Sequence, residues 1–128
     1  MKEPIWLTAE IVLSIQSELL ARFGGLEGIR DETLLDSALN RPLHLFHYEA
    51  PSVFELAASY GHGIVKNHPF LDGNKRAGFM AAYTFLGVNG QRLEAPEEEA
   101  VLYTLGLAAG EISEAEYAAW LERSCVPR

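Results

Sequence analysis

Hydrophobic residues recur every three or four positions along most of this chain, which is the spacing of helices that bury one face. Capping residues, glycines and prolines divide the pattern into predicted helices over residues 8–22, 31–41, 53–67, 74–88, 97–109 and 114–123. Pro42 is expected to end the second helix, which leaves residues 43–51 irregular. No segment alternates with a period of two, so we expect at most a short β-hairpin near residues 24–30. The pattern predicts an all-α fold of about six helices in a single domain over residues 1–128.

The helix predicted over residues 74–88 differs from the others because residues 77–86 are apolar or small on every side. A helix of this kind belongs in a protein core rather than on its surface. The stretch from His68 to Arg76 leads into this helix and carries an imidazole, a carboxylate, an amide and two cations. The first N–H groups of a helix lack partners and carry the positive end of its dipole, so they attract anions. The pattern therefore places a candidate anion site at the start of a buried helix.

Composition narrows the class of protein without identifying a ligand. With a formal net charge of −8, the chain lacks the excess of lysine and arginine that nonspecific nucleic-acid binding requires. A single cysteine, Cys125, excludes an intrachain disulfide and is typical of a reducing cytosol. No apolar run approaches the roughly 20 residues of a membrane span, and the first residues show no signal-peptide pattern. We therefore expect a cytoplasmic protein that binds neither nucleic acid nor membrane directly.

His68, Asp72 and Gly73 have the chemistry that a phosphate-transfer site needs. Imidazole is the one side chain of the stretch that titrates near neutral pH without special surroundings, so His68 is the candidate general base. The Asp72 carboxylate is a hard oxygen ligand of the kind that Mg²⁺ binds together with phosphate oxygens. Gly73 allows a sharp turn and a close approach of the backbone to a ligand.

Asn74, Lys75 and Arg76 complete the candidate site. The Asn74 amide can either hold the loop or donate to a phosphate. Lys75 offers a point charge to a phosphate, and Arg76 offers a planar fork that holds two of its oxygens. Each residue also has a structural explanation, as a cap, a turn or a solvated helix start. Their grouping at the start of the most apolar helix is what favours a site for an anionic ligand.

The stretch resembles the signature of the Fic/Doc superfamily, HPFx[DE]GNGRxxR. The positions that match are His68, Pro69, Phe70, Asp72, Gly73, Asn74 and Arg76. Lys75 stands where Fic enzymes have glycine, and Phe79 stands where they have a second arginine. Both departures are typical of the Doc (death-on-curing) branch, whose signature is HxFxDxNKR. The resemblance extends over much of the chain, including residues 22–26, 29–42, 85–86, 89–90 and 109–113.

This resemblance implies a mainly helical fold with the motif loop between two core helices, and a bacterial toxin paired with an antitoxin. The Doc prototype uses ATP to phosphorylate a threonine of elongation factor Tu, which stops translation. By the same resemblance, His68 deprotonates the target hydroxyl and Asp72 holds Mg²⁺. The nucleotide phosphates would be bound by Gly73, Asn74, Lys75 and Arg76.

Two protein partners follow from the resemblance. The antitoxin would lie in a groove as an amphipathic helical peptide. The target would dock by strand-like pairing on a flap formed by Gly25, Leu26, Ile29 and Arg30.

Lys75 bears on which of two reactions the protein catalyses. In AMP-transferring Fic enzymes the glycine at this position leaves room for phosphates in the loop, whereas a lysine fills that room and adds a charge. The nucleotide would then bind in the reversed sense and present its γ-phosphate to the acceptor. The resemblance therefore favours phosphate transfer over AMP transfer. An AMP transferase, and a non-catalytic binding module that keeps the fold, remain the alternatives.

The remaining histidines, His44, His47 and His62, belong to no recognised metal-ligand pattern and are expected to be structural. Tyr60 and Tyr83 are expected to be core aromatics.

Overall fold

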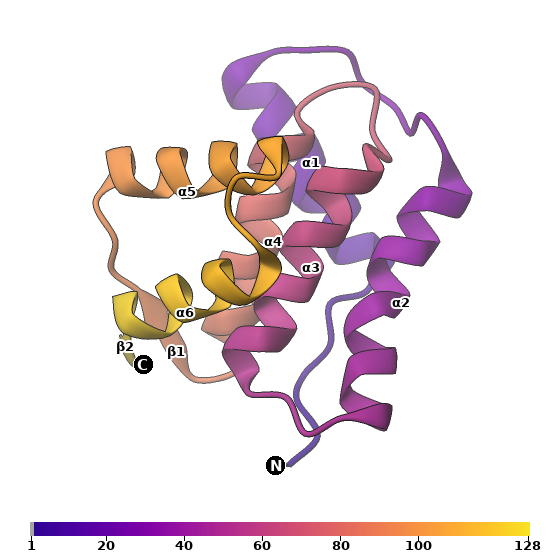
Figure 1. The fold of residues 1–128 in the computed structure, drawn as a ribbon. Helices are drawn as coiled ribbons and strands as arrows, with labels where there is room; N and C mark the ends of the chain where they lie inside the picture. Colours follow the sequence, from indigo (N-terminus) through magenta and orange to yellow (C-terminus); the bar gives the residue numbers. More distant parts are fainter. Residues whose placement is uncertain (1) are drawn as a thin grey trace.

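The computed structural model describes residues 2–128, which form six α-helices and one two-stranded sheet (Figure 1). In chain order the elements are α1 (Ala9–Phe23), α2 (Glu32–Tyr48), α3 (Val53–Asn67), α4 (Asn74–Val88), β1 (Gln91–Leu93), α5 (Glu97–Ala109), α6 (Glu114–Ser124) and β2 (Cys125–Pro127). The predicted all-α class is confirmed, and the bounds of α3 and α4 agree with the prediction at both ends. For α3 the reason is local, because Ser52 and Glu55 form a capping box at its first turn.

α3 and α4 lie side by side at the centre of the molecule, and residues 68–73 form the loop that joins them. The predicted burial of α4 is confirmed along its inner face, and α3 is buried still more completely. Tyr60 on α3 is fully buried, and its hydroxyl accepts a hydrogen bond from the backbone N–H of Leu7 at 3.1 Å. The prediction that Tyr83 is a core residue is wrong, because its side chain is 40% exposed. Its ring lies next to Phe79 on the outer face of α4. The other helices do not cover this face completely, since Phe79 is only half-buried and Tyr83 is exposed.

Glycines allow α3 and α4 to approach each other closely. A Cβ atom at Gly78 would lie 2.6 Å from Cγ2 of Val65 and 3.1 Å from the carbonyl oxygen of Gly61. Further along α4, a Cβ atom at Gly87 would meet only the end of the flexible Arg128 side chain. Substitution by alanine should therefore change the free energy of unfolding in opposite directions at these two glycines.

Gly78→Ala is expected to lower the free energy of unfolding by about 1 to 2 kcal/mol, because overpacking outweighs the gain in helix propensity. Gly87→Ala is expected to raise that free energy by up to about 1 kcal/mol, because the helix-propensity gain is opposed only by a shift of the flexible end of the Arg128 side chain. Urea unfolding of the two variants measures the difference. Equal stabilities would show that Gly78 does not set the spacing between α3 and α4.

α2 continues through Pro42 to Tyr48, which corrects the prediction that this proline ends the helix. Pro42 has no N–H to donate to the carbonyl oxygen of Ala38. That oxygen lies beside the backbone of Gly63 on α3 instead. Beyond the proline, Leu45 and Phe46 keep the helical spacing and pack against the core. Their burial offsets the lost hydrogen bond, and this tertiary contribution leaves no local signal in the sequence.

Residues 24–31 form the α1–α2 connector. This connector contains no β-hairpin, and within residues 2–128 the only strands are β1 and β2, which pair antiparallel with each other. The hairpin prediction is therefore wrong. Three connector glycines have positive φ angles, which interrupts an extended backbone. The connector instead makes one isolated bridge, from Ile29 to Phe70 in the loop between α3 and α4.

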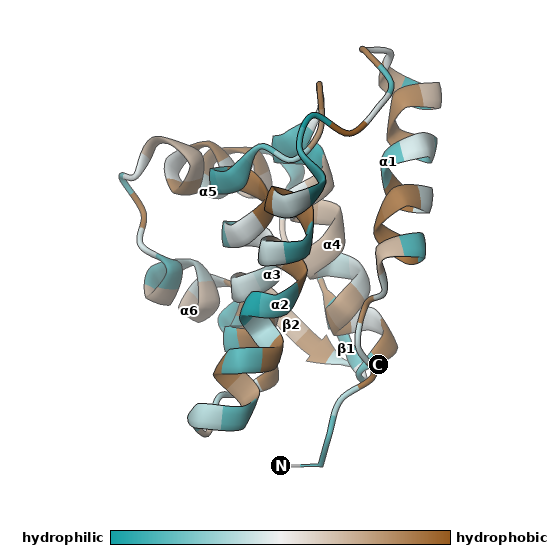
Figure 2. Cartoon of the chain, turned by 90° about the vertical axis from the view of Figure 1, so that its right-hand side faces the viewer, coloured by the Kyte–Doolittle hydropathy of each residue, from teal (hydrophilic) through white to brown (hydrophobic). Residues whose placement is uncertain are grey.

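α1 is an amphipathic helix that lies over the start of α4. Figure 2 shows hydrophobic and hydrophilic residues alternating along it. Val12 and Gln16 are its buried residues, whereas Phe23 at its end is exposed. Within residues 2–128, no helix combines the length and the apolar composition that a membrane span requires.

Candidate functional site

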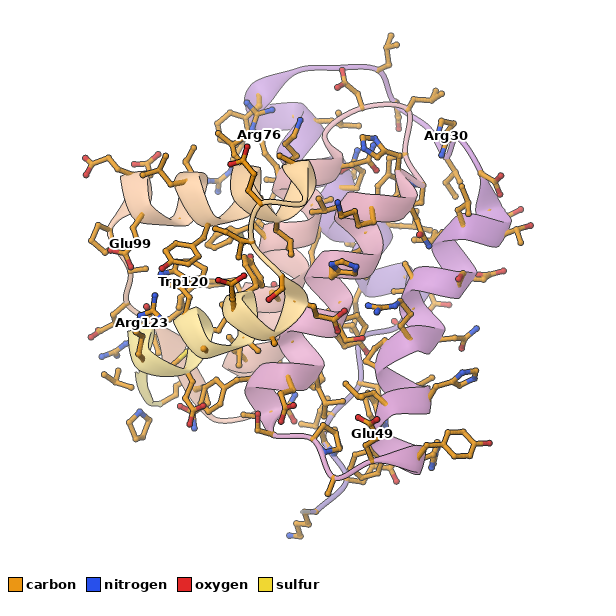
Figure 3. All side chains as sticks on the ribbon, viewed as in Figure 1. Arg30, Glu49, Arg76, Glu99, Trp120 and Arg123 are labelled. Atoms are coloured by element: carbon orange, nitrogen blue, oxygen red, sulfur yellow. The ribbon has the colours of Figure 1, made fainter. Side chains whose placement is uncertain are left out.

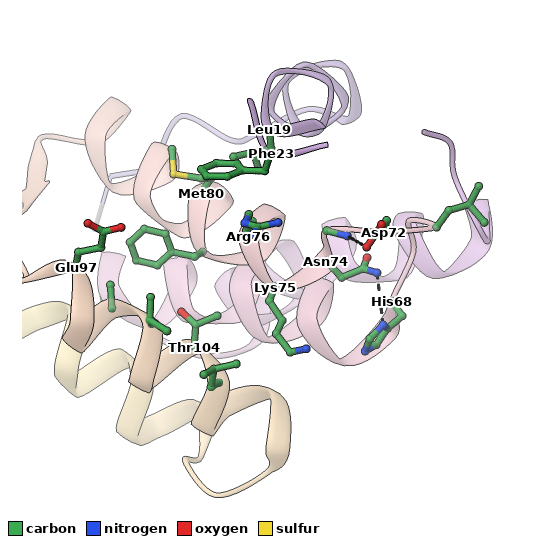
Figure 4. Close-up of a pocket in the computed structure, with 16 residues that line it drawn as sticks. Leu19, Phe23, His68, Asp72, Asn74, Lys75, Arg76, Met80, Glu97 and Thr104 are labelled. Atoms are coloured by element: carbon green, nitrogen blue, oxygen red, sulfur yellow. Dashed lines mark hydrogen bonds between the residues drawn. The ribbon is translucent and has the colours of Figure 1, made fainter. Parts of the chain in front are cut away.

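A cavity of about 770 Å³ opens at the N-terminal end of α4 (Figure 4). It is bordered by the end of α1, by residues 68–73 between α3 and α4 (the motif loop), by the first turns of α4 and by α5. The residues predicted to act as base, metal ligand and phosphate ligands all line it: His68, Asp72, Gly73, Asn74, Lys75 and Arg76. The apolar part of the lining comes from α1, the motif loop, α4 and α5, and it includes Phe23, Leu71, Phe79, Met80, Val101 and Leu105. The structure therefore brings the predicted site residues together in one cavity.

His68 is the exposed residue that ends α3. Its backbone is left-handed, with φ 51° and ψ 55°, and it is the only non-glycine residue of the described chain with positive φ. The following residue, Pro69, disfavours helical backbone at His68 and so helps to end the helix there. The imidazole borders the cavity, and its Nδ1 atom lies 3.4 Å from Nδ2 of Asn74.

Asn74 is buried and clamps the motif loop. Its Oδ1 atom accepts from the N–H of Phe70 at 3.0 Å, and its Nδ2 atom donates to the carbonyl oxygen of Phe70 at 3.0 Å. These two bonds determine which end of the amide faces His68, so the NH₂ group is directed at Nδ1. A neutral His68 then carries its proton on Nε2 in this arrangement. Of the two roles open to Asn74, the geometry favours holding the loop over binding a phosphate.

The Asp72 carboxylate is exposed and faces the α1–α2 connector. Its Oδ1 atom accepts from the N–H of Gly73 at 2.9 Å, and Oδ2 accepts from the N–H of Leu26 at 3.3 Å. Each oxygen keeps a further lone pair. The carboxylate can therefore still bind a cation.

Gln16 is a site residue that the sequence did not reveal. Its Nε2 atom donates to the backbone oxygen of Asp72 at 2.6 Å, which ties α1 to the motif loop. Only 4% of Gln16 is exposed, and its Oε1 atom has no hydrogen-bond partner in the described chain. The sequence does contain one sign of this role. Gln16 is a polar residue one helical turn after Val12, on the face of the helix where apolar residues are expected.

The first turn of α4 presents N–H groups and two cations to the cavity. Gly73 is the N-cap, with φ 74°, and no side chain caps the helix. Lys75 and Arg76 are exposed, and within residues 2–128 neither forms an ion pair. The Arg76 guanidinium lies 4.4 Å from the centre of the Phe23 ring. This end of α4 is therefore suited to bind an anion.

The predicted flap residues lie against the motif loop. Gly25 and Leu26 contact the Asp72 carboxylate, and Ile29 forms the bridge described above. The Arg30 side chain is exposed and donates to the backbone oxygens of Asn67 at the end of α3 and of His68. Their role in docking a target stays a prediction.

No three His, Cys, Asp or Glu side chains within residues 2–128 form a cluster that could hold a metal ion. His44 lies beside Tyr48, and His62 lies beside Glu114 in a half-buried position. Burial lowers the pKa of His62 below its ordinary value. A cation at Asp72 would therefore take most of its ligands from water and phosphate oxygens, which fits Mg²⁺.

Known proteins share the motif loop and the helices that carry it. The model of the Fic/DOC family matches residues 6–86, from the segment before α1 to within α4. The chain belongs to the Fic/Doc family. It is 31% identical over 118 residues to the protein of Escherichia phage P1 named Protein kinase doc, a match that covers 91% of this chain and 93% of that protein.

A second relative is Toxin Doc of Mycolicibacterium smegmatis, which is 41% identical over 75 residues. That match covers 57% of this chain and 58% of the relative's length. α5, which supplies part of the apolar lining of the cavity, lies beyond the residues that the Fic/DOC family model matches. The family model thus covers α1, α2, α3, the motif loop and most of α4, whereas the match to the phage P1 protein extends over 91% of the chain.

Proposed function

We propose that this Fic/Doc protein is the toxin of a bacterial toxin–antitoxin pair and transfers the γ-phosphate of ATP to a hydroxyl side chain of a translation factor. The observation that carries the proposal is one cavity shared by the exposed His68, the start of α4 and the cations Lys75 and Arg76. The names Toxin Doc and Protein kinase doc support the toxin and kinase parts. By family resemblance the target is elongation factor Tu, modified in the bacterial cytoplasm.

In this mechanism the phosphates of ATP lie against the first N–H groups of α4. Lys75 and Arg76 neutralise their charge, and the Phe23 ring helps to orient the Arg76 guanidinium. His68 accepts the proton of the target hydroxyl on Nδ1, its unprotonated ring nitrogen, in place of the long 3.4 Å contact of that atom with Asn74. The hydroxyl oxygen bonds to the γ-phosphorus while the bond from that phosphorus to the β–γ bridging oxygen breaks. The products are a phosphorylated side chain, ADP and a proton that His68 releases to solvent.

Asp72 is the residue proposed to hold Mg²⁺. Its exposed carboxylate accepts one backbone N–H on each oxygen and keeps capacity for a cation. The ion, when bound, neutralises charge on the phosphates. Asp72 is itself held through its backbone by Gln16, so α1 supports this part of the site.

The antitoxin is proposed to bind as an amphipathic helix along apolar side chains that α1 and α5 leave exposed. Phe23 on α1 and Val101 and Leu105 on α5 are exposed and border the cavity. An apolar helix face bound there would cover these side chains and obstruct the entry of ATP.

Transfer of label from ATP separates the proposed kinase from its alternatives. Purified protein incubated with elongation factor Tu is expected to transfer label from γ-labelled ATP and none from α-labelled ATP. Lys75→Gly should lower this transfer without unfolding the protein, because Lys75 is an exposed residue in the first turn of α4. Label from α-labelled ATP alone would make the protein an AMP transferase. Label from neither would favour the non-catalytic binding module.

A further inference from the structure

The guanidinium of Arg30 is bound to the end of the helix that carries His68. Its Nε atom donates to the backbone oxygen of His68 at 2.6 Å, and its Nη2 atom donates to the backbone oxygen of Asn67 at 2.8 Å. Figure 3 shows Arg30 beside the loop that joins α3 to α4. The last carbonyl groups of a helix have no partners within the helix, so a cation here caps α3.

His68 needs this support because its backbone conformation is unfavourable. Residues with a side chain rarely adopt a left-handed turn, and a following proline favours an extended backbone instead. A change of His68 from φ 51° to an extended conformation would move the imidazole relative to the start of α4. The loop therefore has to be held from outside.

The backbone of the α1–α2 connector places Arg30 against this loop. The N–H groups of Arg30 and Asp31 both donate to the carbonyl oxygen of Pro69, at 2.6 Å and 3.1 Å. The N–H of Leu71 donates back to the carbonyl oxygen of Gly28 at 3.1 Å. The connector and the motif loop thus form one hydrogen-bonded unit, and the side chain of Arg30 extends it to the carbonyl group of His68.

We infer that Arg30 is a positioning residue that holds His68 in the turn from which its imidazole reaches the acceptor hydroxyl. The inference rests on the proposed role of His68 as base. The phosphate side of the site is held separately, because Asn74 clamps the loop from α4 and Gln16 binds the Asp72 backbone from α1. Loss of Arg30 should therefore impair proton transfer and leave the binding of ATP intact.

A lysine at position 30 should not fulfil the positioning role of Arg30. A planar guanidinium directs separate N–H groups at two successive carbonyl oxygens, whereas an ammonium group is a single point charge. Arg30→Lys should therefore behave like Arg30→Ala. Arg92→Ala is the matched control, because Arg92 is an exposed arginine on β1 that pairs with Glu94.

Rates with γ-labelled ATP and elongation factor Tu, together with ATP affinity by calorimetry, test this inference. Arg30→Ala is expected to lower kcat by about 10- to 100-fold, the effect of a small misplacement of a reacting group, with the Kd of ATP unchanged. Added guanidinium ion should restore part of the lost rate in Arg30→Ala. The control variant Arg92→Ala should have the kcat and the Kd of ATP of the unaltered protein. An unchanged rate in Arg30→Ala, a fully active Arg30→Lys, or a parallel loss of ATP affinity would overturn the inference.

Hydrogen exchange separates a failure of this inference from a failure of the proposed function. If the unaltered protein transfers no phosphate, the proposed function fails, yet the contacts of Arg30 can still be tested. The amide protons of Asp31 and Leu71 should exchange faster in Arg30→Ala than in Arg92→Ala, because the unit that protects them is weakened. Equal exchange in the two variants would overturn the positioning role. Arg30→Lys serves for both measurements if the alanine variant does not fold.

Discussion

Replacing His68 by asparagine is expected to lower the rate of phosphate transfer by about 10²- to 10⁴-fold, which is the usual contribution of a general base. The imidazole is exposed and contacts Asn74 at 3.4 Å, so its removal should cost little stability. Asparagine tolerates a left-handed backbone better than most residues, so it keeps the turn at φ 51°. The variant therefore separates the chemistry of the side chain from the geometry of the loop.

The measurements are rates with γ-labelled ATP, ATP affinity by calorimetry, and growth of cells that express the protein. His68→Asn should bind ATP normally, because the phosphates are proposed to lie on the start of α4, and it should no longer arrest growth. Growth arrest that persists in this variant would show that toxicity comes from binding rather than catalysis. A loss of ATP affinity that matches the loss of rate would place His68 among the nucleotide ligands instead.

Asn74→Ala is expected to lower the free energy of unfolding by about 3 kcal/mol, because two buried backbone groups of Phe70 lose their partner. In a domain of this length, such a loss lowers the melting temperature by about 10 °C. Phosphate transfer should fall too, because the loop that carries His68 and Asp72 loses its clamp. Asn74→Asp should lose at least as much stability as Asn74→Ala, since its carboxylate would be a buried charge directed at the carbonyl oxygen of Phe70, to which it cannot donate.

Asn89→Ala is the matched control at the other end of α4. The Asn89 amide makes a similar clamp, accepting from the N–H of Ile5 at 2.7 Å and donating to the carbonyl oxygens of Ile5 and Phe85. Its loss should also lower the melting temperature, but the folded protein should keep its transfer rate, because Asn89 does not border the cavity. Thermal unfolding by circular dichroism and rates measured below the transition compare the variants. Equal losses of rate would mean that Asn74 acts only through global stability.

The helices around the site could be predicted because their ends depend on neighbouring residues. Ser52 and Glu55 satisfy free N–H groups at the start of α3, and Ser113 and Glu116 do the same for α6. Pro69 interrupts the helical pattern between α3 and α4. The candidate site residues lie within nine consecutive positions, so their shared location in one cavity follows from short-range spacing. The prediction that Tyr83 is a core residue is wrong because burial depends on distant segments. An apolar pattern does not show which face of a helix the other helices leave uncovered.

The all-α class, the ends of the two central helices and the identity of the polar loop could be predicted from the sequence, because each depends on residues close together in the chain. The way in which that loop is held depends on tertiary packing, because Gln16 and Arg30 reach it from α1 and from the α1–α2 connector. Packing also explains why α2 continues through Pro42, where it outweighs a local stop signal. Hydrogen bonds and burial between distant segments leave no local pattern, so these supports are defined only when the helices pack together.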